Sequence, residues 1–135
     1  MAHMLVKILF LLFIMPYNIK GIEVHIHDNL PPNTPKLVVR CQSGDDDLGV
    51  QSLGTGDDYK FSFGFKLTTL FFCHFSWNGK DVSFDVFNDI GYCVHDGKKF
   101  VPLFTKSCYW VVQVDGFYLG HSDNGKIVAD KYRDW

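Results

Sequence analysis

The sequence predicts an all-β fold, a small antiparallel β-sandwich held by two intramolecular disulfides. Apolar and polar residues alternate along several short runs, which is the period of a half-buried strand. The pair Asn78-Gly79 separates two such runs and is the strongest short-range signal of a β-hairpin. The four cysteines are an even number, as expected of a secreted chain that pairs them.

The first 21 residues are predicted to be a secretory signal peptide, and residues 22–135 a single domain. The unbroken apolar run Ile8–Met15 is followed by Pro16 and then by polar residues up to Gly21, where cleavage is expected. The run is too short for a transmembrane helix, which needs about 20 apolar residues. The alternative is an uncleaved amphipathic anchor. Residues 1–3 are either part of the leader or a remnant of expression.

The early strands are predicted between turn-rich breaks. Val24 and Ile26 alternate with His25 and His27 in a first strand. The remaining segments follow in order: a proline loop at Pro31–Pro35, a strand with Leu37, Val39 and Cys41 on one face, a turn at Ser43–Asp47, a weaker strand at Leu48–Leu53, and a strand with Phe61, Phe63 and Phe65 on one face.

The stretch from Thr68 to Phe87 is predicted to be a hairpin closed by Asn78-Gly79. This turn places Trp77 opposite Lys80. It then predicts three further pairs, Phe75–Val82, Cys73–Phe84 and Phe71–Val86. These pairs are all apolar, so the side-chain pattern and the turn chemistry specify the same register.

The last part of the chain is less regular. Asn88–Lys106 contains Cys93 and is the least regular segment, predicted to be a long loop that could contain short strands. A strand at Lys106–Asp115 follows, with Cys108, Trp110, Val112 and Val114 on one face, then an Asp115-Gly116 turn into Phe117–Leu119, and a polar tail from Gly120 to Trp135 with no assigned strand.

Four cysteines allow three connectivities. Cys41, Cys73 and Cys108 are in phase with apolar neighbours, so we expect them to face the core. A disulfide bond there is expected to stabilise the fold by roughly 2–4 kcal/mol. We favour Cys41–Cys108, because both lie inside core strands, and Cys73–Cys93, because Cys93 follows the return strand of the hairpin.

Catalysis and metal binding are not expected. Cys73 and His74 are neighbours on a strand and point to opposite faces, so they cannot form a nucleophile–base pair. His25 and His27 share a face and could chelate zinc or copper, although a solvated strand face is the simpler interpretation. The aspartates of Asp45–Asp47 could bind calcium, but their spacing is not that of an EF-hand, and we expect them to cap turn amides. No cofactor is expected.

Three segments together resemble the plant self-incompatibility S-protein family, also called S-protein homologues. They are "RCQSGDDDLGVQSL" (Arg40–Leu53), "TTLFFCHFSW" (Thr68–Trp77) with "FDVF" (Phe84–Phe87), and "CYWVVQVDGFYL" (Cys108–Leu119). The sequence departs from the family pattern in the acidic turn around Gly44–Asp45, at Phe87, where tyrosine is common, and in its longer Cys93–Cys108 segment. The resemblance implies a small secreted β-sandwich with disulfides and no enzymatic activity. The founding poppy stigma protein of that family is a ligand for a pollen membrane receptor and triggers rejection of self pollen.

We therefore expect a secreted, extracellular recognition ligand that binds a cell-surface membrane receptor as a monomer. The candidate receptor contacts are loop residues, namely Asn78, Lys80, Asp96, Lys98 and Lys99. Nucleic acid is not an expected partner because the chain has no basic run and a formal net charge of −2, and stable membrane insertion is not expected either. One alternative is a secreted module that binds small ligands or carbohydrates. A weaker alternative is a metal-binding antimicrobial protein that uses His25 and His27.

Overall fold

The computed structural model describes residues 21–64 and 69–135, so the predicted leader and Phe65 lie outside the described residues, apart from Gly21 at the expected cut. The described elements are β1 (Ile22–Asp28), β2 (Leu37–Gln42), β3 (Asp47–Leu53), β4 (Asp58–Phe63), β5 (Phe71–Trp77), β6 (Lys80–Phe87), the 3₁₀ helix η1 (Gly97–Lys99), β7 (Ser107–Gln113), β8 (Gly116–Asp123) and β9 (Lys126–Arg133).

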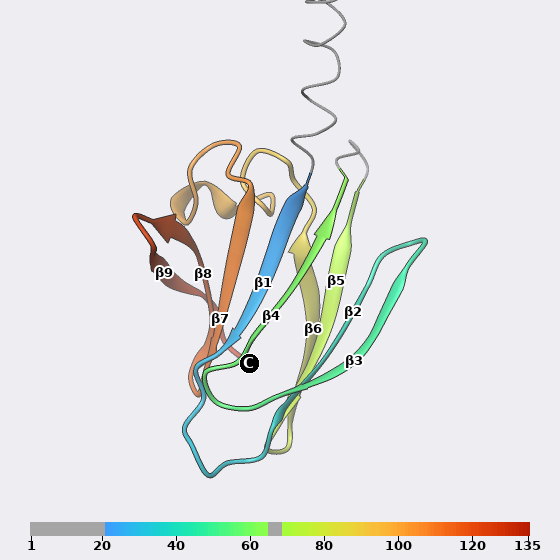
Figure 1. Ribbon diagram of the computed structural model, residues 1–135, viewed down its shortest axis with the longest axis vertical. Helices are drawn as coiled ribbons and strands as arrows, with labels where there is room; N and C mark the ends of the chain where they lie inside the picture. The colour runs from blue at the N-terminus through green and yellow to red at the C-terminus, as the bar shows by residue number, and fades with distance from the viewer. Residues whose placement is uncertain (1–20, 65–68) are drawn as a thin grey trace, which may run out of the picture.

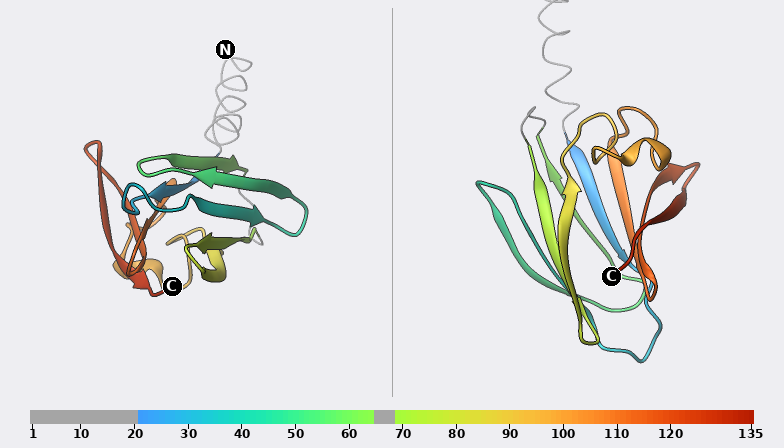
Figure 2. Two further views of the ribbon diagram at one scale, coloured as in Figure 1. Left: turned by 90° about the horizontal axis from the view of Figure 1, so that it is seen from below. Right: turned by 180° about the vertical axis from the view of Figure 1, so that it is seen from behind.

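Two sheets form the fold and confirm the predicted β-sandwich (Figures 1 and 2). The larger sheet has the order β4-β1-β7-β8-β9, and the smaller has the order β3-β2-β5-β6. Neighbouring strands are antiparallel with one exception, because β1 and β7 run parallel, with Glu23 beside Ser107. The first strand of the described chain therefore lies inside the larger sheet, second from its β4 edge and next to a strand formed by much later residues.

Alternating side chains fill the space between the sheets. Val24 and Ile26 of β1 and Trp110 of β7 are fully buried, as the period-two pattern predicts. The Trp110 Nε1–H donates to the backbone carbonyl of Val86, 3.0 Å away in the opposite sheet. The Trp110 ring also packs edge-on against Tyr132, with the ring centroids 5.1 Å apart. One side chain thus contributes both apolar area and a polar link between the layers.

The Asn78-Gly79 hairpin has the predicted register near its turn. Trp77 pairs with Lys80, and the next two predicted pairs are also present. Asn78 and Gly79 have φ of 49° and 80°, the left-handed values that a tight hairpin turn requires. The prediction is wrong at Phe71, which pairs with Phe87 instead of Val86, because a bulge interrupts the ladder between Phe71 and Phe72.

A second Asn-Gly hairpin lies in the tail for which no strand was predicted. Asn124 and Gly125 have φ of 51° and 83° and connect β8 to β9. The preceding turn also differs from the prediction. It is formed by residues 114–115, so that Gln113 pairs with Gly116, and Val114 lies beyond the end of β7 and is 46% exposed.

The favoured disulfide pairing is wrong, although all four cysteines are buried and paired. The bonds are Cys41–Cys73 and Cys93–Cys108, not Cys41–Cys108 and Cys73–Cys93. Cys41 and Cys73 lie opposite each other on the neighbouring strands β2 and β5, with Cα atoms 4.0 Å apart. Cys93 lies in the loop that crosses to the larger sheet, so its near partner is Cys108 at the start of β7.

Asp28, at the end of β1, is a buried carboxylate, only 2% exposed. Burial raises its pKa above the usual 3.8, the hydrogen bond that it accepts from the Leu30 amide opposes this rise, and the Asp57 carboxylate adds to it. The folded state therefore holds this proton more tightly than the unfolded state, and the Asp28 contribution to stability is lost as pH rises above 3.8.

We expect Asp28→Asn to gain stability relative to the parent protein as pH rises from acid to neutral, because asparagine keeps an oxygen for the Leu30 amide without a buried charge. Urea unfolding at a series of pH values measures the difference. Asp45→Asn, at an exposed position in the turn after β2, is the control. A constant difference between Asp28→Asn and the parent across this pH range would contradict the assignment.

Candidate recognition surfaces

The predicted contact residues lie at two opposite ends of the sandwich (Figure 1). Asn78 and Lys80 are exposed at the turn before β6, whereas Asp96, Lys98 and Lys99 are exposed in the loop after it. The strand β6, eight residues or about 26 Å long at 3.3 Å per residue, runs from the turn to the start of that loop. The structure therefore does not bring the five residues together, and each end is a separate candidate surface.

We call the end around Lys80 the hairpin-tip surface. It consists of Lys36, Asn78, Lys80, Asp81, Val114, Asp115 and Trp135. The Lys80 ammonium donates to the backbone carbonyl of Val114, 3.3 Å away, and so connects a hairpin of the smaller sheet with a hairpin of the larger one. Shallow pockets lie on both sides of Lys80, one toward Asp115 and Trp135 and the other toward Lys36.

Aromatic side chains hold the hairpin-tip surface in place. The Trp77 Nε1–H donates to the Pro35 carbonyl at 3.0 Å, and the Trp135 Nε1–H donates to the Gln113 carbonyl at 2.9 Å. The two indole rings stack with centroids 6.1 Å apart. These contacts fix the loop before β2 and the end of the chain against the hairpins.

Within the described residues, both lysines of the hairpin-tip surface, Lys36 and Lys80, are free of a carboxylate partner, unlike the nearby Lys131. The Lys131 ammonium lies 2.6 Å from the Asp134 carboxylate and 3.7 Å from that of Asp115. Its hydrogen bond lowers the pKa of Asp134, while the same bond raises the pKa of Lys131, so both groups stay ionised. Within the described ranges, Lys80 forms no ion pair. Its ammonium can therefore meet a carboxylate of a partner.

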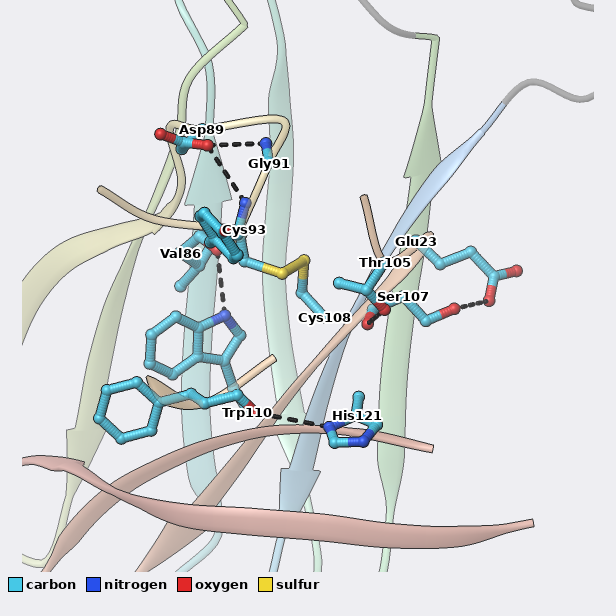
Figure 3. The surroundings of a disulfide bond; sticks show 12 residues. Glu23, Val86, Asp89, Gly91, Cys93, Thr105, Ser107, Cys108, Trp110 and His121 are labelled. Carbon is cyan, nitrogen blue, oxygen red and sulfur yellow. Dashed lines mark hydrogen bonds between the residues drawn. A yellow bond between two sulfur atoms is a disulfide. The ribbon is translucent and has the colours of Figure 1, made fainter. Parts of the chain in front are cut away.

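The opposite end is dominated by the β6–β7 loop, residues 88–106. The Cys93–Cys108 disulfide joins this loop to β7, and the Asp89 carboxylate accepts hydrogen bonds from the Gly91 and Tyr92 amides at 2.7 and 3.1 Å (Figure 3). A Cβ at Gly97 would lie 1.9 Å from the Tyr92 carbonyl oxygen, so only glycine permits this close approach. The loop is therefore a fixed structure despite its length.

Tyr132 of β9 joins the β6–β7 loop to the edge of the larger sheet. Its hydroxyl donates to the Asp96 carboxylate at 2.7 Å, and its ring packs on Phe100 with centroids 5.4 Å apart. Burial and this hydrogen bond to Asp96 raise the pKa of the Tyr132 hydroxyl. Asp96 is thus held in place by the fold, which makes it a weaker contact candidate than Lys98 and Lys99.

Two exposed apolar residues in the same loop were not predicted as surface residues. Leu103 is 55% exposed, and Phe104 is 65% exposed with φ of 58°. The signal in the sequence was an apolar Pro-Leu-Phe triplet inside an otherwise irregular and basic segment. Apolar residues are usually assigned to a core, so this signal was missed.

The histidine and aspartate alternatives gain no support from the geometry. Both ring nitrogens of His25 face carboxylates, with Nδ1 2.7 Å from Asp58 and Nε2 3.2 Å from Glu23. The Asp58 carboxylate also lies 3.8 Å from His27 Nδ1, so the carboxylates of the protein itself already contact the nitrogens that a chelating pair would use. His25 is also buried, contrary to the solvated face expected for it. In the acidic turn, Asp47 caps the Gly49 amide at 3.0 Å, as predicted, whereas Ser43 Oγ accepts from the amides of Asp45 and Asp46 at 3.4 and 3.0 Å.

Two other kinds of site, a metal cluster and a membrane span, have no counterpart in the described residues. No three histidine, cysteine, aspartate or glutamate side chains are grouped there in a way that would hold a metal ion. No described helix has the length and apolar character needed to cross a membrane. The ring of Tyr109, on the outer face of the larger sheet, stacks on His25 at 4.1 Å, so that one of its faces is not free for a sugar.

Comparison with known sequences identifies relatives along most of the domain. A family model described as plant self-incompatibility protein S1 matches residues 23–135. In Arabidopsis thaliana, S-protein homolog 19 is 35% identical over 89 residues, which is 63% of this chain and 67% of the relative. S-protein homolog 29 is 32% identical over 117 residues, which is 83% of this chain and 76% of the relative. The match spans less of other relatives, 42% of S-protein homolog 2 and 51% of S-protein homolog 3.

A solved structure has the same fold. It is that of an SPH (Self-Incompatibility Protein Homologue) protein, described as one of a widespread family of small, highly stable, secreted proteins from plants. The match covers 86% of this chain and 90% of that chain, with a TM-score of 0.53 and 21% identity. The class defined by fold and surface is thus a small disulfide-linked β-sandwich with exposed loops at both ends. The chain belongs to the plant self-incompatibility protein S1 family, the S-protein homologues.

Proposed function

We propose that this protein is a secreted extracellular ligand that binds a cell-surface receptor protein and acts by recognition rather than catalysis. Its family membership supports this proposal, as does the pairing of all described cysteines, because structural disulfides persist in oxidising compartments. Residues 1–21 act in this proposal as the secretory leader. A role in pollen rejection or in another cell-to-cell signal would use the same binding event.

The observation that carries the proposal is the hairpin-tip surface. It combines concave pockets, a partly exposed tryptophan at Trp135 and an unpaired ammonium group at Lys80. Protein interfaces favour aromatic anchors in pockets with charges that select the partner at the rim. The tip is also held by two tryptophan hydrogen bonds, so little ordering is needed on binding.

We expect Lys80→Glu to weaken saturable binding of the labelled, oxidised protein to responsive plant cells by about tenfold, or about 1.4 kcal/mol. Lys80 lines both pockets, and the reversed charge would repel a carboxylate of the partner. The cytosolic calcium response should decrease in parallel. Lys60→Glu, an exposed lysine on β4, is the charge-matched control.

A second variant tests the candidate contacts in the β6–β7 loop. Replacing Asp96, Lys98 and Lys99 by alanine together tests the β6–β7 loop as the receptor site. If that variant loses binding while Lys80→Glu binds normally, the receptor contacts the loop and not the hairpin-tip surface. If both variants bind as the parent does, neither end is the receptor site.

A further inference from the structure

The tip of the β6–β7 loop combines exposed apolar side chains with unpaired lysines. We call this group, Lys98, Lys99, Leu103, Phe104 and Lys106, the basic-apolar tip. The segment from Gly97 to Lys106 contains three lysines and no acidic residue, in a chain whose acidic residues outnumber its basic ones. In the portion of the chain that the structure describes, none of the three lysines forms an ion pair.

The exposure of Leu103 and Phe104 is imposed by the loop backbone. The Phe104 amide donates to the Gly91 carbonyl at 2.7 Å, and the Thr105 amide donates to the Pro102 carbonyl at 3.2 Å. These bonds hold Phe104 at φ of 58°, a conformation that is unfavourable for a bulky side chain. Because 65% of Phe104 is left in solvent, the fold gains little packing in return.

Three carboxylates near the tip already have hydrogen-bond partners within the protein. Asp89 accepts hydrogen bonds from two loop amides, Asp96 accepts one from the Tyr132 hydroxyl, and Glu23 lies 3.2 Å from His25 Nε2. The segment from Gly97 to Lys106 itself carries three positive charges and no negative one next to an apolar pair, at the end of the molecule where β6 ends and β7 begins (Figure 2).

We propose that the basic-apolar tip binds the surface of a lipid bilayer that exposes anionic head groups. Leu103 and Phe104 enter the boundary between head groups and acyl chains, while Lys98, Lys99 and Lys106 contact the phosphates. The lysine stems lie along the apolar boundary and keep their ammonium groups in the polar layer. The attachment is peripheral and salt-sensitive, because two apolar side chains are too few for insertion. This contact leaves the hairpin-tip surface, at the opposite end, free for a receptor.

The experiment measures co-sedimentation of the oxidised protein with phosphatidylcholine vesicles, with and without phosphatidylserine. We expect binding only to the phosphatidylserine vesicles, with a partition coefficient that falls about fivefold for each tip lysine replaced by glutamine. Lys36→Gln/Lys126→Gln removes the same charge elsewhere and should bind as the parent does. Leu103→Ser/Phe104→Ser should not bind, whereas Ile127→Ser/Val128→Ser, which changes residues 41% and 47% exposed on β9, should.

Phe104→Gly separates a binding role from a structural one. Glycine adopts φ of 58° without strain, so Tm should stay the same or rise while vesicle binding falls.

The proposal is overturned if the parent protein does not sediment with phosphatidylserine vesicles, or if Leu103→Ser/Phe104→Ser binds them as the parent does. Cell binding that needs the tip but is abolished by protease treatment of the cells, with no vesicle binding, would assign the tip to an acidic protein instead. Lys80→Glu should leave vesicle binding unchanged, so the receptor proposal is tested separately.

Discussion

Trp110→Ala is expected to lower the free energy of unfolding by about 3–5 kcal/mol, the range for removing a large aromatic side chain from a core. Trp110 has no exposed surface, and its ring meets Phe84 of the opposite sheet at a centroid distance of 5.3 Å. The substitution also leaves the buried Val86 carbonyl without its donor. Urea unfolding with both disulfides intact measures the loss.

Two further variants isolate the parts of this effect. Trp110→Phe keeps most of the apolar volume but removes the indole donor, and it should cost about 1–3 kcal/mol. Val114→Ala, at an exposed turn position, should stay within about 0.5 kcal/mol of the parent. A loss for Trp110→Ala no larger than that of Val114→Ala would mean that the sheets do not pack around Trp110.

Cys93→Ala/Cys108→Ala is expected to cost about 3 kcal/mol, the loop-closure value for a bond that spans 15 residues. Because this bond joins the β6–β7 loop to β7, amide exchange in residues 88–106 should accelerate more than exchange in the smaller sheet. Hydrogen exchange followed by mass spectrometry measures this difference.

The second disulfide provides the matched comparison. Cys41→Ala/Cys73→Ala removes a bond that spans 32 residues and should cost about 4 kcal/mol, with no selective loosening of the β6–β7 loop. Equal exchange in the loop for the two double variants would contradict the role given to Cys93–Cys108. Peptide mapping of the oxidised protein checks both pairings directly.

The parts of the fold that depend on neighbouring residues could be predicted from the sequence. The Asn78-Gly79 hairpin was found because the turn chemistry and the apolar alternation agree within one short stretch. The β8–β9 hairpin has the same Asn-Gly signal, but β9 is an edge strand whose residues are mostly exposed, so it lacks an apolar face. The turn signal at Asn124-Gly125 was therefore present, but the alternation of apolar and polar residues that would have supported a hairpin was not.

The parts that depend on strand order could not be predicted. The pairing of β2 with β5 decides that Cys41 meets Cys73, and nothing local to either cysteine encodes that neighbour. The same holds for the candidate surfaces, because loop positions alone do not place Lys80 and Lys98 at opposite ends. The exposure of Phe104 could not be predicted for another reason. It follows from the backbone hydrogen bonds of Phe104 and Thr105, which cannot be inferred from a pattern of residue types.

The parallel pairing of β1 with β7 has a consequence for the order in which the protein folds. Glu23 and Ser107 are 84 positions apart, so β1 leaves the ribosome long before the strand that lies beside it. Contacts between such distant residues form late, because closing a long loop costs conformational entropy. Completion of the larger sheet is therefore a slow step. The Cys93–Cys108 bond joins residues only 15 positions apart, so its closure does not depend on the arrival of β1. An oxidised Cys93 in a newly made chain would therefore show that the β6–β7 loop has closed, and not that the larger sheet is complete.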